Sequence, residues 1–258
     1  MSNSMILLVS VGTNMLRAKQ ESYDAILHQL EEHSGKRVLQ VFTDDSTADA
    51  VSDGDERVYG VEEGIEEAIR SGAGKVLVVP VFMNRGELYN GLQSRLDFYR
   101  DRIEIKLADP VLRDQAACDH VEEILEQMIN IDENKEYLLV AHGNPSYHAA
   151  SYRYLQKSFD EKGHKNVKVV PLMEKDSYGQ TITFLKARKA DETKAQVVII
   201  PLIVAWGDYM ADILYNAQDS FMWNLRNAGY RTVFSGRGLG EHALFRAIYN
   251  DRLDEIDQ

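Results

Sequence analysis

The sequence contains a single cysteine, Cys118, among its 258 residues. One thiol excludes an internal disulfide and any zinc site built from several cysteines. Long hydrophobic runs are also absent, because the longest (residues 76–80 and 197–204) fall well short of the ~20 residues that a membrane-spanning helix needs. Residues 1–4 carry no basic segment, and the apolar stretch 5–9 is too short for the core of a signal peptide. We therefore expect a cytoplasmic protein.

Basic residues are in short supply. The chain has 29 Lys and Arg against 41 Asp and Glu, which gives a formal net charge of −12. Nucleic acids and anionic membrane surfaces bind proteins through a basic face, so neither is an expected partner. The acidic residues gather at positions 44–45, 53–56 and 62–67, which we interpret as solvated helix starts and loops. With 44% hydrophobic residues, the composition is that of a globular protein with one large or two compact domains.

Apolar runs rich in β-formers alternate with stretches of helical periodicity along the whole chain. The predicted strands cover residues 6–11, 38–43, 75–81, 103–107, 137–140, 167–172, 197–204 and 231–235. The predicted helices cover residues 22–33, 62–71, 91–99, 114–131, 149–162, 181–189, 221–228 and 241–253. Continuous apolar strands that alternate with helices indicate an α/β fold, with parallel sheets covered on both faces.

The second part of the chain repeats the first. Residues 79–88 and 200–209 both place a proline in a dense strand, a glycine six positions later, an acid next, and helical apolar residues after it. The runs Leu8-Val9-Ser10-Val11-Gly12-Thr13-Asn14 and Leu139-Val140-Ala141-His142-Gly143-Asn144 also match. Internal duplication predicts two similar α/β halves, residues 1–132 and 133–258, joined at a polar break near residues 132–136.

Ligands of such sheets bind beyond the carboxyl ends of the strands, where polar side chains occur in the second half. His142 follows one predicted strand, Glu174 another, and Asp208 and Tyr209 a third. His142 is either a strand cap or a metal ligand and proton acceptor. Glu174 is either a solvated loop charge or a second group of the site, and Tyr209 either a packing residue or a ligand.

The first half lacks the matching polar groups. Val11 stands where His142 stands in the repeat, and Leu88 stands where Tyr209 stands. We therefore expect the residues that carry the chemistry in the second half (133–258), and we expect the first half mainly to line the ligand site. The methionines near the strand ends fill core gaps or contact an apolar planar ligand; they are Met83, Met173 and Met210. The remaining histidines show no pair at metal-binding spacing on one helix face; they are His28, His33, His120, His148, His164 and His242.

Taken in order, these segments resemble a known family. They are Ser10-Val11-Gly12-Thr13, Ala141-His142-Gly143-Asn144, Glu174, residues 201–208 and Gly238-Leu239-Gly240-Glu241. The chain is similar to the anaerobic sirohydrochlorin cobaltochelatases, which are class II tetrapyrrole chelatases. The resemblance spans essentially the whole chain. It implies the chelatase fold, in which two flavodoxin-like halves hold a tetrapyrrole in the cleft between them, and it suggests a homo-oligomer.

The resemblance also implies an activity and a set of site residues. The activity is ATP-independent insertion of a divalent metal into sirohydrochlorin or a relative, with no permanently bound cofactor. The metal substrate would be Co²⁺ first, with Fe²⁺ or Ni²⁺ as the other candidates. His142 and Glu174 match the metal-binding and catalytic residues of the family, but Tyr209 replaces its last histidine. Phe82 stands where the family has a further histidine, and only Glu87 could supply the acid that follows. The expected substrate-binding residues are Ser10, Thr13, Phe82, Met83, Glu87 and Asp208.

Three functions stay open at this point, because Tyr209 replaces an expected histidine. Chelation needs ligands that strip water from the metal and a base that accepts two pyrrole protons. Imidazole serves both purposes near neutral pH, whereas an ordinary phenol, with a pKa of ~10, is protonated and ligates Co²⁺ poorly. The first function is the chelatase. The second is binding or transfer of haem or another metallated tetrapyrrole, with His142 or Tyr209 as axial ligand. The third is a diverged homologue without a tetrapyrrole. A polycarboxylate macrocycle requires local cations, for which the candidates are Arg17, Lys19, Arg85, Arg153 and Arg237.

Overall fold

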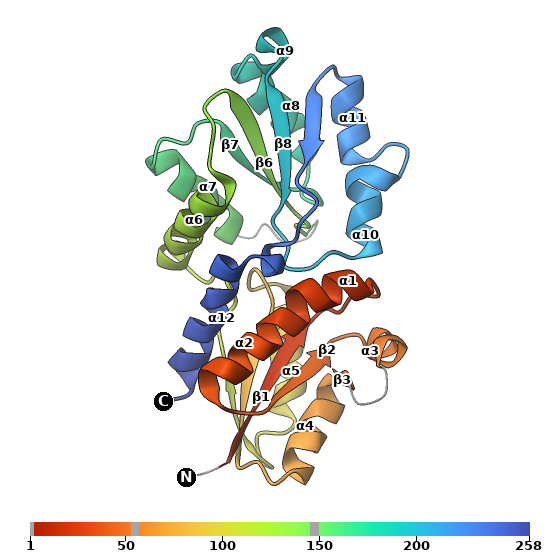
Figure 1. The fold of residues 1–258 in the computed structure, drawn as a ribbon, viewed down its shortest axis with the longest axis vertical. Coiled ribbons are helices and arrows are strands. Elements are labelled where there is room, and N and C mark those ends of the chain that lie inside the picture. The colour runs from red at the N-terminus through yellow and green to blue at the C-terminus, as the bar shows by residue number, and fades with distance from the viewer. Residues whose placement is uncertain (1–2, 53–56, 145–149) are drawn as a thin grey trace. The chain divides into compact units, whose positions relative to one another are not determined.

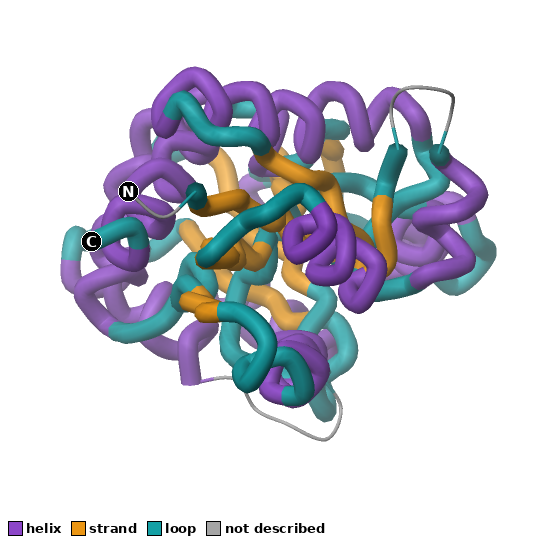
Figure 2. Tube along the Cα trace, turned by 90° about the horizontal axis from the view of Figure 1, so that it is seen from below, coloured by secondary structure: helices purple, strands orange, loops and turns teal. Residues whose placement is uncertain are grey.

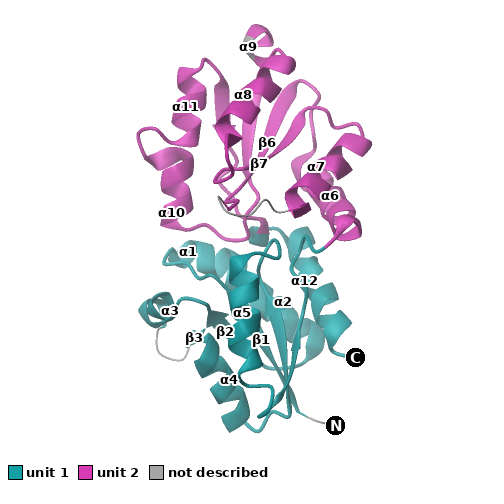
Figure 3. Cartoon of the chain, turned by 180° about the vertical axis from the view of Figure 1, so that it is seen from behind, with its two compact units in different colours: residues 1–113, 240–258 teal, residues 114–239 magenta. Residues whose placement is uncertain are grey.

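The computed structural model describes residues 3–52, 57–144 and 150–258. The chain forms an α/β fold with two parallel sheets, as the sequence predicts. It divides into two compact units, which Figure 3 draws in teal and magenta. Unit 1 combines Met1–Arg113 with Gly240–Gln258, and unit 2 is Asp114–Leu239. No helix in the described part of the chain has the length and apolar character needed to cross a membrane.

The sheet of unit 1 has the strand order β3-β2-β1-β4-β5, with every neighbouring pair parallel (Figure 1). The strands are β1 (Ser4–Ser10), β2 (Val38–Phe42), β3 (Tyr59–Gly60), β4 (Lys75–Pro80) and β5 (Glu104–Leu107). The helical elements are α1 (Leu16–Ala18), η1 (Lys19–Asp24), α2 (Ala25–Ser34), α3 (Asp45–Val51), α4 (Val61–Arg70), α5 (Glu87–Asp97) and α12 (Ala243–Ile256).

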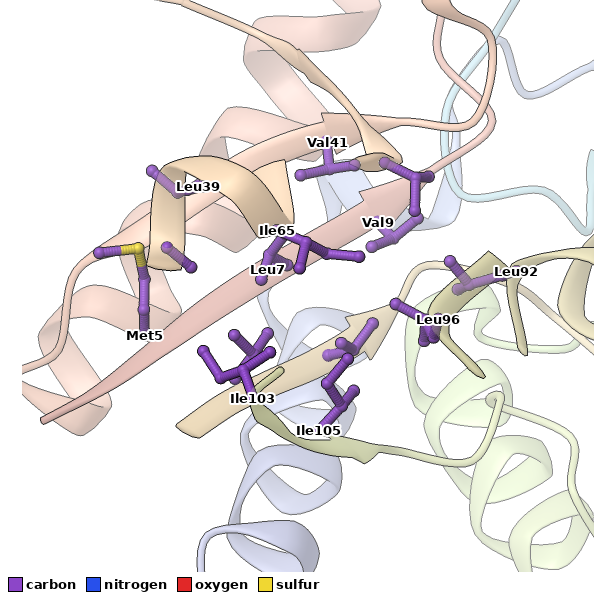
Figure 4. Packing of buried hydrophobic residues seen from close by; sticks show 14 of the residues in the cluster. Met5, Leu7, Val9, Leu39, Val41, Ile65, Leu92, Leu96, Ile103 and Ile105 are labelled. Atoms are coloured by element: carbon purple, nitrogen blue, oxygen red, sulfur yellow. The ribbon is translucent and has the colours of Figure 1, made fainter. Parts of the chain in front are cut away.

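Both faces of this sheet are buried, because the central strands carry apolar side chains at successive positions. Figure 4 shows one face, where Leu7 of β1, Ile65 of α4 and Leu92 of α5 belong to one cluster of buried residues. Alternation along the strand sends Ile6 and Leu8, which are also fully buried, to the opposite face. On that side α2 packs against β2, and α12 packs against α2 and β4.

The sheet of unit 2 has the order β7-β6-β8-β9, again entirely parallel. Its strands are β6 (Lys135–Ala141), β7 (Val167–Pro171), β8 (Gln196–Pro201) and β9 (Arg231–Phe234). Its helical elements are α6 (Gln115–Ile129), α7 (Ala150–Glu161), α8 (Ser177–Ala187), α9 (Ala190–Thr193), α10 (Asp208–Ala211), η2 (Asp212–Asn216) and α11 (Phe221–Asn227). A short 3-10 turn, η3 (Leu239–Glu241), contains the return to unit 1. Figure 2 distinguishes the strands from the helices that flank them.

The repeat seen in the sequence is a repeat of topology. Both sheets contain the flavodoxin-like arrangement, in which the first strand lies between the second and the third long strands. The registers match as well, because Val9 pairs with Pro80 in unit 1 and Val140 pairs with Pro201 in unit 2.

The compact units differ from the halves 1–132 and 133–258 predicted from the sequence. Helix α6 lies in the first half of the chain but packs against α7 in unit 2. Helix α12 lies in the second half but packs against α2 and β4 in unit 1. Each compact unit therefore contains one helix from the other half of the chain: α12 belongs to unit 1 and α6 to unit 2.

The acidic helix starts that the sequence predicts occur at two of the three clusters. The carboxylate of Asp44 caps α3 by accepting a hydrogen bond from the Thr47 N–H at 3.1 Å. Glu62 lies in the first turn of α4 and pairs with Arg95, which lowers the pKa of the Glu62 carboxyl. The third cluster, residues 53–56, lies outside the described residues.

Candidate functional site

The carboxyl edge of the unit 2 sheet has a topological switch point between β6 and β8. The chain leaves β6 toward β7 on one side and later returns to form β8 on the other side. In open α/β sheets this arrangement opens a crevice beyond the strand ends, and ligands bind there. His142 directly follows β6, and the segment from Leu202 to Tyr209 follows β8. The candidate site is built from these two segments.

His142 is exposed and has a defined ring orientation. Its Nδ1 lies 2.7 Å from the carbonyl oxygen of Gly143. Because a carbonyl only accepts hydrogen bonds, this contact places the proton of the neutral imidazole on Nδ1. The Nε2 atom then carries a lone pair, which is the form that ligates a metal or accepts a proton.

Tyr209 lies directly beside His142, because the two residues follow the neighbouring strands β8 and β6. The two ring centroids are 5.6 Å apart, with an angle of 40° between the ring planes. Tyr209 is 60% exposed and occupies the first turn of α10. Gly207 precedes that helix in an extended conformation. The pair therefore presents an imidazole and a phenol together at the surface of unit 2.

Glu174 is held near His142 through the backbone. The N–H of Met173 donates to the carbonyl oxygen of His142 at 2.8 Å, and Glu174 is the next residue. The Glu174 N–H donates to the carbonyl of Pro171 at 3.2 Å, which fixes the turn after β7. The Glu174 side chain is half-buried, whereas Asp208, which precedes Tyr209, is exposed.

The corresponding edge of unit 1 is apolar where unit 2 is polar. Val11 follows β1 with 43% exposure, and Leu88 in the first turn of α5 is 51% exposed. Of the expected substrate-binding residues in this unit, Glu87 is exposed and Met83 is half-buried. The other three are Ser10, Thr13 and Phe82, which are at most 5% exposed. In this conformation they lie beneath the surface of the edge, and the Thr13 hydroxyl accepts a hydrogen bond from the Met15 N–H at 3.2 Å.

The candidate cations fall into two groups. In unit 1, Lys19 is buried and paired with Asp24 at 2.9 Å, Arg17 pairs with Glu21 at 2.8 Å, and Arg85 pairs with Asp109. In unit 2, Arg153 and Arg237 are exposed. Arg153 lies near the start of α7, which follows β6, and Arg237 follows β9, so both belong to the carboxyl edge of the sheet.

Cys118, the single cysteine of the sequence, does not add to this site. Burial raises the pKa of the Cys118 thiol to about 12, so it is protonated at neutral pH and is neither a metal ligand nor a nucleophile. His148 lies outside the described residues.

Sequence reasoning missed a group formed by Glu122, Glu126 and His164, whose ligand atoms all lie within 4.8 Å of one another.

Gly143 fixes the turn that carries His142. It has φ +75°, and a Cβ added there would lie 2.9 Å from the Cβ of Pro171 and 3.1 Å from its carbonyl carbon. Its equivalent in the repeat, Gly12, also has positive φ, at +98°. Gly143→Ala is expected to lower the free energy of unfolding by about 3 kcal/mol, from backbone strain together with the collision.

The matched control is Gly163→Ala, because Gly163 has φ +89° but no atom within 4 Å of an added Cβ. It carries the backbone strain alone, and we expect it to cost about 1 kcal/mol. Urea unfolding of the two variants measures the difference. Equal losses would show that the collision with Pro171 is relieved at no cost.

The fold is shared with proteins of known structure. A structure of SirB from Bacillus subtilis with Fe3+ superposes with a TM-score of 0.70 and 17% identity, covering 98% of this chain and 95% of that one. DR2241 from Deinococcus radiodurans superposes with a TM-score of 0.59 and 15% identity, covering 98% of this chain and 55% of that one. DR2241 is described as a multi-domain protein with structural similarity to chelatases and two additional novel domains.

A search of curated proteins gave no match. The family model described as cobalt chelatase (CbiK) matches residues 4–257, which is nearly the whole chain. The matched range includes both sheets and every strand-end residue described above. The chain therefore belongs to the cobalt chelatase (CbiK) family.

Proposed function

We propose that this protein inserts a divalent metal, Co²⁺ first, into sirohydrochlorin or a related tetrapyrrole without ATP. The observation that carries the proposal is the contact between the rings of His142 and Tyr209, whose centroids are 5.6 Å apart. The contact lies at the switch point of a sheet, in a member of the cobalt chelatase family. Fe²⁺ and Ni²⁺ are the alternative metal substrates.

In this proposal His142 acts as metal ligand and as base. The hydrogen bond from Nδ1 to Gly143 leaves the Nε2 lone pair available to replace a water on the metal. As the metal passes to the macrocycle, the same atom can accept one of the two pyrrole protons, and the second passes to water. Glu174 supplies a carboxylate from the neighbouring strand end. Tyr209 adds a phenol oxygen, which ligates strongly only when the metal displaces its proton.

Three apolar residues of unit 1 are exposed where the chain leaves the strands of that unit's own sheet. Val11, Leu88 and Leu16 are 43%, 51% and 63% exposed, and all three follow the carboxyl ends of β1 or β4. Exposed apolar side chains at the carboxyl edge of a sheet suit contact with the apolar faces of a tetrapyrrole ring. Arg153 and Arg237 of unit 2 supply positive charge for the carboxylates of the macrocycle.

The second candidate function is binding of haem or another metallated tetrapyrrole. The presence of Tyr209 where the family has histidine favours it, because tyrosine is an established ligand of haem iron. Absorbance of the protein as purified separates the two functions. Bound haem gives a Soret band, and a resting chelatase has none.

The direct test is to mix the purified protein with sirohydrochlorin and Co²⁺, Fe²⁺ or Ni²⁺ in turn, without ATP, and to follow the absorbance change of the macrocycle. We expect metallation faster than in the protein-free mixture, and fastest with Co²⁺. Rates equal to the protein-free mixture for all three metals would contradict the proposed activity.

Arg237→Glu is expected to raise KM for sirohydrochlorin about fivefold and to leave kcat unchanged, because an exposed charge contributes modestly and acts before the chemical step. Arg231→Glu is the matched control. It makes the same charge change on an exposed residue at the other end of β9, away from the carboxyl edge. Steady-state kinetics at low ionic strength measures both variants. Equal changes in KM would show that Arg237 acts only through the net charge of the protein.

A further inference from the structure

A second group of metal-ligating side chains lies away from the strand ends of unit 2. Glu122 and Glu126 are one turn apart on α6, and His164 follows α7, which packs against α6. The His164 Nε2 lies 3.2 Å from an oxygen of Glu126 and 3.6 Å from an oxygen of Glu122. One ligand atom from each of the three residues lies within 4.8 Å of the other two.

Glu122 is an unusual residue for a purely structural ion-pair network. Its side chain is 0% exposed, and the ammonium of Lys162 pairs with its Oε2 at 2.7 Å, which raises the pKa of Lys162. Among the described residues the other oxygen, Oε1, accepts no hydrogen bond, and it is the oxygen that faces His164. A buried carboxylate is costly unless a cation or hydrogen-bond donors satisfy it.

The spacing of the three residues suits a metal ion. In a tetrahedral zinc site, nitrogen and oxygen ligands about 2.1 Å from the metal lie about 3.4 Å from each other. The two separations from the His164 Nε2, 3.2 Å and 3.6 Å, bracket that value. We propose that Glu122, Glu126 and His164 form a binding site for a divalent transition metal ion such as Zn²⁺, distinct from the edge that carries His142.

The ligand set indicates the class of metal. One imidazole and two carboxylates match the borderline ligand preference of Zn²⁺ and its neighbours, whereas Mg²⁺ and Ca²⁺ prefer oxygen alone. Three protein ligands leave the fourth position to water. Lys162 competes with the metal, because its ammonium also lies 3.5 Å from Glu123 and 3.8 Å from Glu126.

The site has a structural consequence for unit 2. A bound metal would tie the residue that follows α7 to the middle of α6. Since α7 is the helix between β6 and β7, it joins the strand that ends before His142 to the strand that ends before Glu174. Metal binding would therefore stabilise the connection between two residues of the candidate active site without contacting either.

The test uses Zn²⁺ alone, titrated into full-length His142→Ala protein by calorimetry, so that metal binding at the strand-end site is removed. We expect one Zn²⁺ to bind. Adding His164→Ala or Glu126→Gln should weaken binding at least about tenfold, and adding Lys162→Met should strengthen it by a similar factor. Thermal unfolding provides a second readout, in which Zn²⁺ raises Tm before but not after His164→Ala is added.

His120→Ala is the matched control, because His120 is an exposed histidine of the same helix, 3.9 Å from Glu123. It should leave the Zn²⁺ affinity and the Tm shift unchanged. The proposal is overturned if His164→Ala and His120→Ala bind Zn²⁺ equally, or if Zn²⁺ fails to bind and to raise Tm. Because His142 is absent throughout, neither result depends on whether the protein is a chelatase.

Discussion

The His142→Ala protein is expected to lose metal insertion, with a fall in kcat of at least about 10³-fold. The substitution removes an atom that serves first as ligand and then as base, and general base catalysis alone contributes about 10²–10⁴-fold. Because His142 is exposed and follows the end of β6, it contributes little to the core, and the fold should stay intact. Metallation of sirohydrochlorin with Co²⁺ measures the first effect, and thermal unfolding the second.

His28→Ala is the control for this experiment, since His28 is 70% exposed on α2 of unit 1 and pairs only loosely with Glu31, at 3.8 Å. Its activity and Tm should match those of the unaltered protein. If His142→Ala inserts metal at the unaltered rate and binds the tetrapyrrole with unaltered affinity, both the chelatase proposal and the haem-binding alternative fail.

Tyr209→His is expected to raise cobalt insertion. The substitution places a second imidazole at the position of the Tyr209 phenol. The centroid of the phenol ring lies 5.6 Å from that of the His142 ring. Imidazole binds Co²⁺ at neutral pH, whereas a phenol must first lose a proton whose ordinary pKa is ~10. The size of the increase in the rate of cobalt insertion distinguishes a chelatase from a haem-binding protein. A working cobalt chelatase gains modestly, and a haem-type binder gains from a baseline near zero, with a parallel change in haem affinity.

The comparison requires a histidine introduced elsewhere in the same unit. Tyr154→His serves this purpose, because Tyr154 is 41% exposed on α7 and has no ring contact with His142 in the described structure. It should leave insertion and tetrapyrrole binding unchanged. If Tyr209→His alters neither property, the phenol takes no part in the site and the third ligand lies elsewhere.

The sequence predicted the strands and the His142 edge because both depend on local pattern. Apolar runs indicate buried strands, and a residue directly after such a strand must lie at the carboxyl edge of the sheet. The two-residue strand β3 (Tyr59–Gly60) was missed because it is too short to show a period. The exchange of α6 and α12 was missed for another reason. An amphipathic helix shows which of its faces is buried, but not which sheet buries it.

The group formed by Glu122, Glu126 and His164 shows the same limit at a site. Two glutamates four residues apart on a helix are common on solvated surfaces and carry no signal of their own. Nothing in the sequence around His164 indicates that it meets α6, because the contact arises from the packing of α6 on α7. Burial of Glu122 separates this group from an ordinary surface ion pair, and burial was not visible in the sequence.

The position of α12 has a consequence for the order in which the protein folds during synthesis. Unit 2 is one continuous stretch, Asp114–Leu239, so all of its residues have been made before α12 exists. Unit 1 has to wait for α12, whose Phe245, Ile248 and Tyr249 are almost completely buried. Until those residues leave the ribosome, the partner surfaces of α12 on α2 and β4 remain open to water. The unit made first is therefore completed last, and its nascent form exposes apolar surface while unit 2 folds.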